Sequence, residues 1–284
     1  MRILTILTCH NRAEKTIAAV YQLVQGNPSL LLTFVVVDDG STDDTSLRLQ
    51  ALGEAMKDSC VIHLLRGSGQ LYYSGGMRKA MKYALSYFSQ SFDYLLMIND
   101  DVEFIPRCVE RMILQSKMQK NARGDAVVAG ATKNRQGQLT YGAIVYTKGV
   151  HYRRLNPEEW RRKADTFNAN CVLIPYRAFW EAGAIDERYI HSLGDFDYGL
   201  TLKRLGFSIH GSRDYVGICE NNPMKGSWED PDLSICQRLK KKKSVKGAPL
   251  GPWLYFLRKN FGLYRMFVSG FTPYLRILVE ALRR

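Results

Sequence analysis

The sequence predicts an α/β fold built on a mainly parallel sheet that is covered by helices on both faces. Short apolar runs, typical of buried strands, alternate four times with segments whose apolar residues recur at helical spacing. The four predicted strands cover residues 3–7, 34–37, 61–65 and 94–98, and each ends at polar residues. Since βαβ units place successive strands parallel, this alternation indicates a doubly covered sheet.

The helices between these strands are predicted from apolar residues at spacings of three and four. The first covers 13–24, and the second starts at Ser41 or Asp43 as its N-cap and runs to about Met56. A glycine-rich stretch, 66–76, precedes the third helix, whose apolar face runs from Met77 to Phe88. The fourth helical pattern opens after strand 94–98, at Pro106.

From about residue 126 the pattern changes. Short strand-like runs at 127–130, 139–141 and 171–175 are separated by glycine and polar residues, which favours a mixed sheet. A short helix or turn is expected at 179–185, and a last helical face begins near Asp195 and ends at Gly206.

Composition and charge predict a globular body with a basic tail. The 284 residues are 46% hydrophobic and 24% charged, which is ordinary for a folded protein. From Arg238 to the C-terminus there are twelve Lys or Arg residues and one acid, Glu280, a net charge of +11 that leaves +2 for the rest. We therefore expect a catalytic domain over 1–237 and a basic aromatic helical segment over 238–284.

Cysteine usage and hydropathy favour an intracellular protein. The six cysteines are scattered singly without a C-x-x-C pair, so reduced thiols are expected rather than disulfides or a zinc site. The apolar run at 3–7 is too short for a secretion signal, and no stretch is long enough to span a bilayer. The expected location is the cytoplasm.

Acidic residues cluster at three places that the fold brings to one rim of the sheet. An isolated Asp-Asp pair is usually a polar turn that caps a helix, but three such clusters after strands or at a helix start indicate a shared site. Carboxylates accept an anionic phosphate only when a cation lies between them, so the pattern predicts a metal-dependent site with a base. The clusters are Asp38 with Asp39, Asp100 with Asp101, and Asp195 with Asp197.

Two common nucleotide-binding classes are excluded by their missing motifs. There is no G-x-G-x-x-G after the first strand; Gly67 and Gly69 follow the third strand and lack a third glycine at the required spacing. There is also no G-x-x-x-x-G-K-[ST] sequence. A Rossmann oxidoreductase and a P-loop enzyme are therefore not expected.

Four segments in order, 8–12 (TCHNR), 37–43 (VDDGSTD), 98–101 (INDD) and 194–197 (GDFD), resemble the family 2 glycosyltransferases of the GT-A fold. The resemblance covers roughly residues 1–220, and the order and spacing of the motifs make it more specific than any single one. It implies the GT-A fold and an inverting enzyme that uses a nucleotide-sugar donor.

The resemblance also implies which residues hold the donor. Asp39 matches the acid that binds the nucleotide base, and its acceptor-only carboxylate suits the imide N–H of uracil or thymine, hence a UDP- or dTDP-hexose. Asp101 matches the ligand of Mg²⁺ or Mn²⁺, with Asp100 on ribose or metal-bound water. Residues expected to cradle base and ribose are Thr8, His10, Asn11 and Arg12. For His10 the alternative is a histidine bonded to backbone.

Asp195 matches the family's catalytic base, which would take a proton from the acceptor hydroxyl. The alternative is that Asp195 and Asp197 only favour the first turn of a helix through its dipole. The resemblance also places Gly75 and Gly76 near the donor sugar, with Arg78 at a helix N-terminus suited to anions. The alternative there is a solvated surface helix.

Two positions depart from the family pattern. Gly194 replaces the glutamate that usually precedes the base, so a group that orients the acceptor is missing. Many members carry a late histidine as an extra metal ligand, where this chain has Cys219 and Glu220. His210 comes nine residues too early and is expected to cap a strand.

The tail alternates basic residues with aromatic and aliphatic ones, a composition suited to the surface of an anionic bilayer. Nucleic acid is the rival partner, and a helical appendage packed on the body is the simplest alternative. We expect a hexosyltransferase acting on a saccharide or lipid-linked acceptor in surface polysaccharide synthesis, peripheral on the inner face of the plasma membrane. The rival functions are a sugar-phosphate nucleotidyltransferase and a nucleic-acid-binding protein.

Overall fold

The computed structural model describes residues 1–88 and 92–282. In the first half of the chain, four strands alternate with three helices. Its elements are β1 (Arg2–Cys9), α1 (Ala13–Gly26), β2 (Leu31–Asp38), α2 (Thr45–Ala55), β3 (Cys60–Arg66), α3 (Tyr72–Tyr87) and β4 (Tyr94–Ile98). Strands β3, β2, β1 and β4 pair in that order and all run parallel. The predicted strand–helix alternation is confirmed.

The second half completes the sheet and adds a smaller one. Its elements are β5 (Glu103–Phe104), α4 (Cys108–Met118), β6 (Val127–Lys133), β7 (Leu139–Tyr141), β8 (Ala143–Lys148), β9 (His151–Arg154), η1 (Pro157–Glu159), β10 (Thr166–Phe167), β11 (Cys171–Pro175), α5 (Tyr176–Ala182), α6 (Gly194–Arg204) and β12 (Ile209–Ile218). Strand β11 pairs antiparallel with both β4 and β6, which confirms the predicted mixed sheet. Strands β10, β8 and β9 form a separate three-stranded sheet.

Three predicted boundaries are corrected. Helix α3 begins at Tyr72, so the predicted start beside Gly76 is wrong and both glycines lie inside the helix. The N-cap position of α2 is Asp44, not Ser41 or Asp43, although the Asp43 carboxylate accepts the amide of Thr45 at 3.0 Å. Helix α5 starts three residues earlier than expected because the apolar strand β11 runs directly into it.

Apolar residues form a core on each face of the large sheet. On one face the strands pack against α1, α2 and α4. On the other face they pack against α3, α5, α6 and two residues of the tail, Phe256 and Leu257, both fully or almost fully buried. All six cysteines are free thiols, five of them buried, as the sequence predicts.

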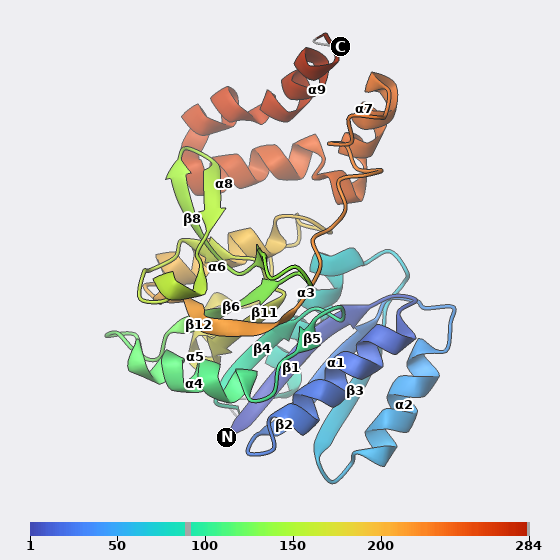
Figure 1. The fold of residues 1–284 in the computed structure, drawn as a ribbon, viewed down its shortest axis with the longest axis vertical. Coiled ribbons are helices and arrows are strands. Elements are labelled where there is room, and N and C mark those ends of the chain that lie inside the picture. Colours follow the sequence, from blue (N-terminus) through green and yellow to red (C-terminus); the bar gives the residue numbers. More distant parts are fainter. Residues whose placement is uncertain (89–91, 283–284) are drawn as a thin grey trace.

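The tail is helical, and its helices lie together at one end of the molecule (Figure 1). It contains α7 (Ile235–Lys243), η2 (Val245–Gly247), α8 (Leu250–Gly270) and α9 (Thr272–Leu282). Helix α7 crosses residue 237, the end predicted for the first domain. Among the described residues, no helix is both long and apolar enough to cross a membrane.

Candidate active site

Polar residues gather where the parallel strands β1, β2 and β4 end. Cys9, the last residue of β1, pairs in register with Asp38, the last residue of β2. Strand β4 pairs with the other side of β1 in the same direction. The segments that follow all three strands therefore emerge at one edge of the sheet, as the sequence predicts.

The loop after β1 is tied to the loop after β2. The side-chain oxygen of Asn11, a residue in the left-handed conformation, accepts the amide of Thr42 at 2.7 Å. The Asn11 amide donates to Ser41 Oγ at 2.9 Å. The exposed His10 ring lies with Nδ1 2.8 Å from the carbonyl oxygen of Asp39. The backbone-bonded alternative for His10 is thus present, in a residue that stays exposed.

Asp39 is buried and organises the glycine-rich loop. Its two carboxylate oxygens accept the amides of Gly69 and Tyr72, at 2.8 and 2.9 Å. A Cβ on Gly67 would lie 2.5 Å from Asp39 Oδ1, so only glycine lets this loop approach so closely. Because a carboxylate has about four acceptor positions, Asp39 keeps capacity for one more donor.

The acid pair after β4 is bridged by a guanidinium. Arg12 Nη1 lies 3.0 Å from Asp100 Oδ1 and 3.0 Å from Asp101 Oδ2. The Asp100 side chain is 7% exposed and the Asp101 side chain 27%. Burial raises the pKa of Asp100 to about 6, although Arg12 opposes that shift. Asp101 is therefore the more accessible carboxylate of the two, and its role as a metal ligand stays a prediction.

A cysteine completes the surroundings of Asp101. The Cys219 thiol lies 3.7 Å from Asp101 Oδ1 and receives a contact of 3.5 Å from the side-chain amide of Asn170. Burial, reinforced by the charge of Asp101, raises the pKa of Cys219 to about 12, so the thiol stays protonated. Cys219 stands where many family members carry a histidine, and nothing in the sequence around it predicts its contact with Asp101.

The acid pair fits a hard divalent cation that takes most of its ligands from outside the protein. Among the described residues no group of three or more His, Cys, Asp or Glu could enclose a metal. Mg²⁺ in nucleotide enzymes is commonly bound by one or two carboxylates, the remaining ligands being phosphate oxygens and water. Asp101 and Asp100 could supply these carboxylate ligands once the Arg12 guanidinium moves away from them.

Asp195 lies in the first turn of α6 and faces the same region. Its Oδ2 accepts the amide of Ala169 at 3.3 Å, and its Oδ1 accepts that of Phe196 at 2.9 Å. Burial raises the pKa of Asp195 to about 6, and the two amides oppose the shift. A carboxylate with a pKa near neutrality is suited to accept a proton from an alcohol and release it afterwards.

Tyr73, a residue that sequence reasoning missed, connects the acids. Its hydroxyl donates to the carbonyl oxygen of Ala169 at 3.3 Å, beside the amide that binds Asp195. Burial, with the nearby charges of Asp195 and Asp101, raises the pKa of Tyr73 well above its usual value. Since the preceding amide, Tyr72, is bound to Asp39, one short segment of α3 links Asp39 to the surroundings of Asp195.

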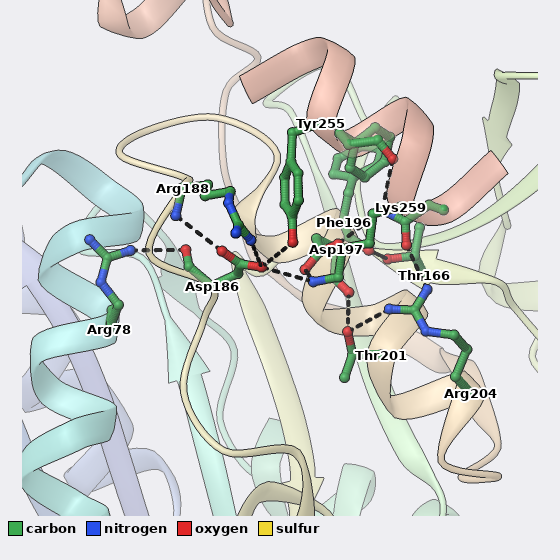
Figure 2. Close-up of polar contacts among 12 residues, drawn as sticks. Arg78, Thr166, Asp186, Arg188, Phe196, Asp197, Thr201, Arg204, Tyr255 and Lys259 are labelled. Carbon is green, nitrogen blue, oxygen red and sulfur yellow. Dashed lines mark hydrogen bonds and ion pairs between the residues drawn. The ribbon is translucent and has the colours of Figure 1, made fainter. Parts of the chain in front are cut away.

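Asp197 serves a different purpose. Its carboxylate is buried, and it accepts from Lys259 Nζ at 2.7 Å and from the Asn260 side chain at 2.9 Å, both on α8. Figure 2 shows Asp197 and Asp186 facing Lys259 and Tyr255 of this helix. The two acids of α6 thus differ in their partners. Asp197 forms an ion pair with Lys259, whereas Asp195 forms none with the described residues.

Close packing explains the departure at Gly194. A Cβ there would lie 2.4 Å from Ser74 Oγ and 3.0 Å from Ile185 Cγ2. The N-terminus of α6 therefore packs directly on α3, and no glutamate side chain has room at this position. Ser74 also donates to the carbonyl oxygen of His191 at 2.6 Å, which holds the same two segments together.

Gly76 packs on the side chain of Thr8, and Arg78 binds backbone carbonyl groups of the protein itself. A Cβ on Gly76 would lie 2.2 Å from Thr8 Oγ1, and the Thr8 hydroxyl donates to Val37 at 3.1 Å. Arg78 donates to the carbonyl oxygens of Asp186 and Tyr189, at 3.1 and 2.8 Å (Figure 2). Arg78 is therefore not at the helix N-terminus predicted for it, because α3 starts six residues earlier, at Tyr72.

A separate cavity of about 650 Å³ contains none of these residues. It lies between α1 and the segment that leads into α4, and it is lined by Tyr21, Phe104, Pro106 and others. Its lining is mostly apolar and carries no cluster of acids, so the chemistry predicted from the sequence belongs to the sheet edge.

Solved structures with the same fold are glycosyltransferases. A mannosyltransferase from Pyrobaculum calidifontis in complex with GDP-Man and Mn²⁺ matches with a TM-score of 0.59 and 13% identity, over 97% of this chain and 68% of that one. S. aureus TarS 1-349 matches with a TM-score of 0.52 and 15% identity, over 98% and 81%. GalNAc-T7 with UDP, GalNAc and Mn²⁺ gives 0.54 and 13%, over 86% and 47%. These likenesses confirm the GT-A fold.

No curated protein sequence matches the chain. The sequence profile described as Glycosyl transferase family 2, however, matches residues 5–183, well over half of the chain. That range includes the ends of β1, β2 and β4 with Asp39 and Asp101, and it stops before Asp195. The chain belongs to glycosyl transferase family 2.

Proposed function

We propose that this glycosyltransferase moves a hexose from a UDP- or dTDP-sugar to a hydroxyl of a saccharide acceptor, with inversion at the anomeric carbon. The observation that carries the proposal is the connection of Asp39, Asp101 and Asp195 at one edge of the sheet. Asp39 binds the Tyr72 amide, the Tyr73 hydroxyl and Asp195 both bind Ala169, and Cys219 joins Asp101 to Asn170, the next residue. These acids provide the three contacts that the reaction needs, to base, diphosphate and acceptor.

The donor is held by the loops after β1 and β2. Asp39 accepts the imide N–H of a pyrimidine through its remaining acceptor capacity, and the exposed His10 ring stacks on the base. Asn11 holds the two loops at the spacing that the nucleoside requires. Thr8 and Gly76 bring α3 against the end of β1, which positions Gly75 beside the donor sugar.

Asp101, with Asp100 beside it, would hold Mn²⁺ or Mg²⁺ on the donor diphosphate. The cation supplies positive charge that stabilises the departing diphosphate. Arg12, which now neutralises the acid pair, is released toward the phosphate oxygens and adds a second positive charge there. Cys219 donates to Asp101 and keeps its carboxylate turned toward the site.

Asp195 is the base. Its carboxylate takes the proton of the acceptor hydroxyl as that oxygen bonds to the anomeric carbon, and the bond from this carbon to the diphosphate oxygen breaks. The amides of Ala169 and Phe196 fix the carboxylate, and burial keeps it poised near neutrality. A single in-line displacement of this kind inverts the anomeric carbon.

The acceptor is a saccharide or lipid-linked saccharide, and the reaction takes place on the cytoplasmic side, at the inner face of the plasma membrane, during synthesis of a surface polysaccharide. The basic and aromatic tail, 238–284, supports this location.

Thermal stability in the presence of UDP, dTDP and GDP, each with and without Mn²⁺, tests the donor assignment. We expect the uridine or thymidine nucleotide to raise the melting temperature most, and Mn²⁺ to increase that effect. Asp101→Ala should abolish the increase due to Mn²⁺ while keeping part of the nucleotide effect. Stabilisation by GDP alone, or an Asp101→Ala variant that responds to Mn²⁺ like the wild type, would contradict the assignment.

A further inference from the structure

The tail helix α8 is divided by a kink at Gly262, where φ is 83° and ψ is 172°. Before the kink the helix is anchored to the catalytic body. Tyr255 donates to Asp186 at 2.7 Å, Lys259 to Asp197 at 2.7 Å, and the Phe261 ring meets Tyr146 edge to face. Figure 2 shows Tyr255 and Lys259 pointing down into this contact. The first half of α8 is therefore part of the folded core.

After the kink the same helix turns an apolar stripe outward. Five residues spaced as one helical face, mostly four apart, are between 50% and 72% exposed: Leu263, Tyr264, Phe267, Val268 and Phe271. The opposite side of this half packs inward, since Ser269 and Gly270 are buried and a Cβ on Gly270 would meet Leu254 at 2.5 Å. The helix is thus held in place with its large side chains in solvent.

Helix α9 repeats this arrangement. Ile277 is fully buried, whereas Leu275, Leu278 and Val279 are exposed at helical spacing. Glu280 is held by Arg238 of α7 at 2.7 Å and by Arg276 at 2.7 Å, which fixes the orientation of α9. Together the two stripes expose eight large apolar side chains within 17 consecutive residues, from Leu263 to Val279, and exposed apolar clusters mark interaction sites.

Unpaired cations accompany the apolar stripes. Lys240, Lys241 and Lys243 of α7 and Arg258 of α8 are exposed, and none forms an ion pair with any part of the chain that the structure describes. Glu280, the one acid of the tail, is already bonded to two arginines. A partner that covers this region must therefore bring both negative charge and apolar material.

We propose that the exposed stripes of α8 after Gly262 and of α9 insert shallowly into the surface of an anionic phospholipid bilayer, with the lysines of α7 on the headgroups. A second copy of this chain would place two strongly basic surfaces together without acids to pair them. A nucleic acid would neutralise the lysines but leave Leu275, Leu278 and Val279 uncovered, because only aromatic residues stack on bases. A bilayer with anionic headgroups satisfies both features.

The docking surface is joined to the catalytic helix. Lys259 and Asn260 lie directly before the kink and bind Asp197, two residues after the proposed base Asp195. Insertion of the stripe would therefore fix the orientation of α6, and of Asp195 with it, relative to the lipid surface that carries a lipid-linked acceptor. The role of this orientation rests on the proposed acceptor and base, whereas binding of the tail to lipid can be measured without either of them.

Co-sedimentation of the full chain with vesicles tests the proposal. We expect binding to phosphatidylcholine vesicles that contain phosphatidylglycerol, little binding to phosphatidylcholine alone, and weaker binding at high salt. The double variant Phe267→Ser, Phe271→Ser should lose at least about tenfold in vesicle affinity, because two aromatic side chains no longer insert. Leu47→Ser with Met118→Ser is the matched control, since both side chains are 70% exposed on other helices.

A variant that removes charge tests the proposal independently of the Phe267→Ser, Phe271→Ser variant. Lys240→Gln, Lys241→Gln and Lys243→Gln together should weaken binding to anionic vesicles and remove most of its salt dependence, without changing the melting temperature. The proposal is overturned if the wild type ignores anionic vesicles, if the serine variant binds as the wild type does, or if sedimentation velocity shows a dimer that this variant dissociates. Nucleotide stabilisation, measured separately, reports whether the proposed function itself fails.

Discussion

The guanidinium of Arg12 lies 3.0 Å from the carboxylate of Asp101, and the same nitrogen lies 3.0 Å from Asp100. A cation from the loop after β1 thus neutralises an acid pair after β4, two strands that are neighbours in the sheet. The site is thereby held together without substrate, and in the proposed function Asp101 would exchange this positive partner for a metal–diphosphate complex.

Arg12→Ala should make the stability of the protein depend on Mn²⁺. Without the guanidinium, Asp100 and Asp101 repel each other, and the free energy of unfolding should fall by about 1 kcal/mol, a small value because Arg12 is half exposed. Differential scanning fluorimetry with and without Mn²⁺ measures this, and the metal should recover most of the loss. Arg48→Ala, which breaks an exposed pair with Glu14, is the control. If the Arg12→Ala variant without Mn²⁺ is as stable as the wild type, the prediction is wrong.

Transfer should depend on the protonation of Asp195. Because burial raises the pKa of this carboxyl to about 6, the base is mostly protonated below that pH, and kcat should fall as the pH is lowered through it. Asp195→Asn should lose about 100-fold or more in kcat and retain nucleotide binding. The observation against this role would be an Asn variant with the wild-type pH profile.

The same pKa shift predicts an effect on stability. A carboxyl whose pKa is raised in the folded state binds its proton more tightly there, so its contribution to stability falls as the pH rises from about 4 to about 6. Above pH 6 the ionised group destabilises the fold. Asp195→Asn should therefore melt at a higher temperature than the wild type at pH 8, with the difference vanishing near pH 4; an equal difference at both pH values would contradict this.

Gly194→Ala should destabilise the junction of α3 and α6. The new methyl group would overlap Ser74, and overpacking of this kind costs about 1–3 kcal/mol in the free energy of unfolding. Urea denaturation measures the change. Gly251→Ala is the matched control because it is also in a helix but has open space around it, so it should be neutral or slightly stabilising. Equal effects for both variants would show that the packing argument is wrong.

Lys259→Gln should loosen the tail from the body. The Asp197 side chain is 3% exposed, so removing the ammonium group of Lys259 leaves a buried carboxylate whose remaining charged or amide partner is Asn260. The free energy of unfolding should fall by about 1–3 kcal/mol. A double-mutant cycle with Asp197→Asn, followed by urea denaturation, should show coupling between the two positions. Strict additivity would mean that the ion pair does not hold α8 in place.

Most of the fold was predictable because the buried strands carry a local signal. The apolar run 94–98 is β4 at the predicted residues, and the change to a mixed sheet after residue 126 corresponds to the antiparallel insertion of β11. The start of α3 was not predictable from apolar spacing, because its first turn is fixed by the bond from the Tyr72 amide to Asp39, a contact over 33 positions.

The site was predicted in outline but not in its connections. Asp39, Asp101 and Asp195 follow recognisable strand or helix ends, whereas Tyr73 and Cys219 reach them only through the tertiary fold. Arg12 was expected to bind nucleotide, and its pairing with the acids could not be read from a motif. The use of Asp197 as an anchor for α8 depends on a helix more than fifty residues later.

The crystal structure of the protein with Mn²⁺ and the nucleoside diphosphate that stabilises it most tests the central claim directly. The account predicts the base against Asp39 and His10, the diphosphate and Mn²⁺ at Asp101, and open space between the terminal phosphate and Asp195 for sugar and acceptor. A nucleotide bound in the cavity lined by Tyr21 and Phe104, or on a surface that Asp195 does not reach, would contradict it.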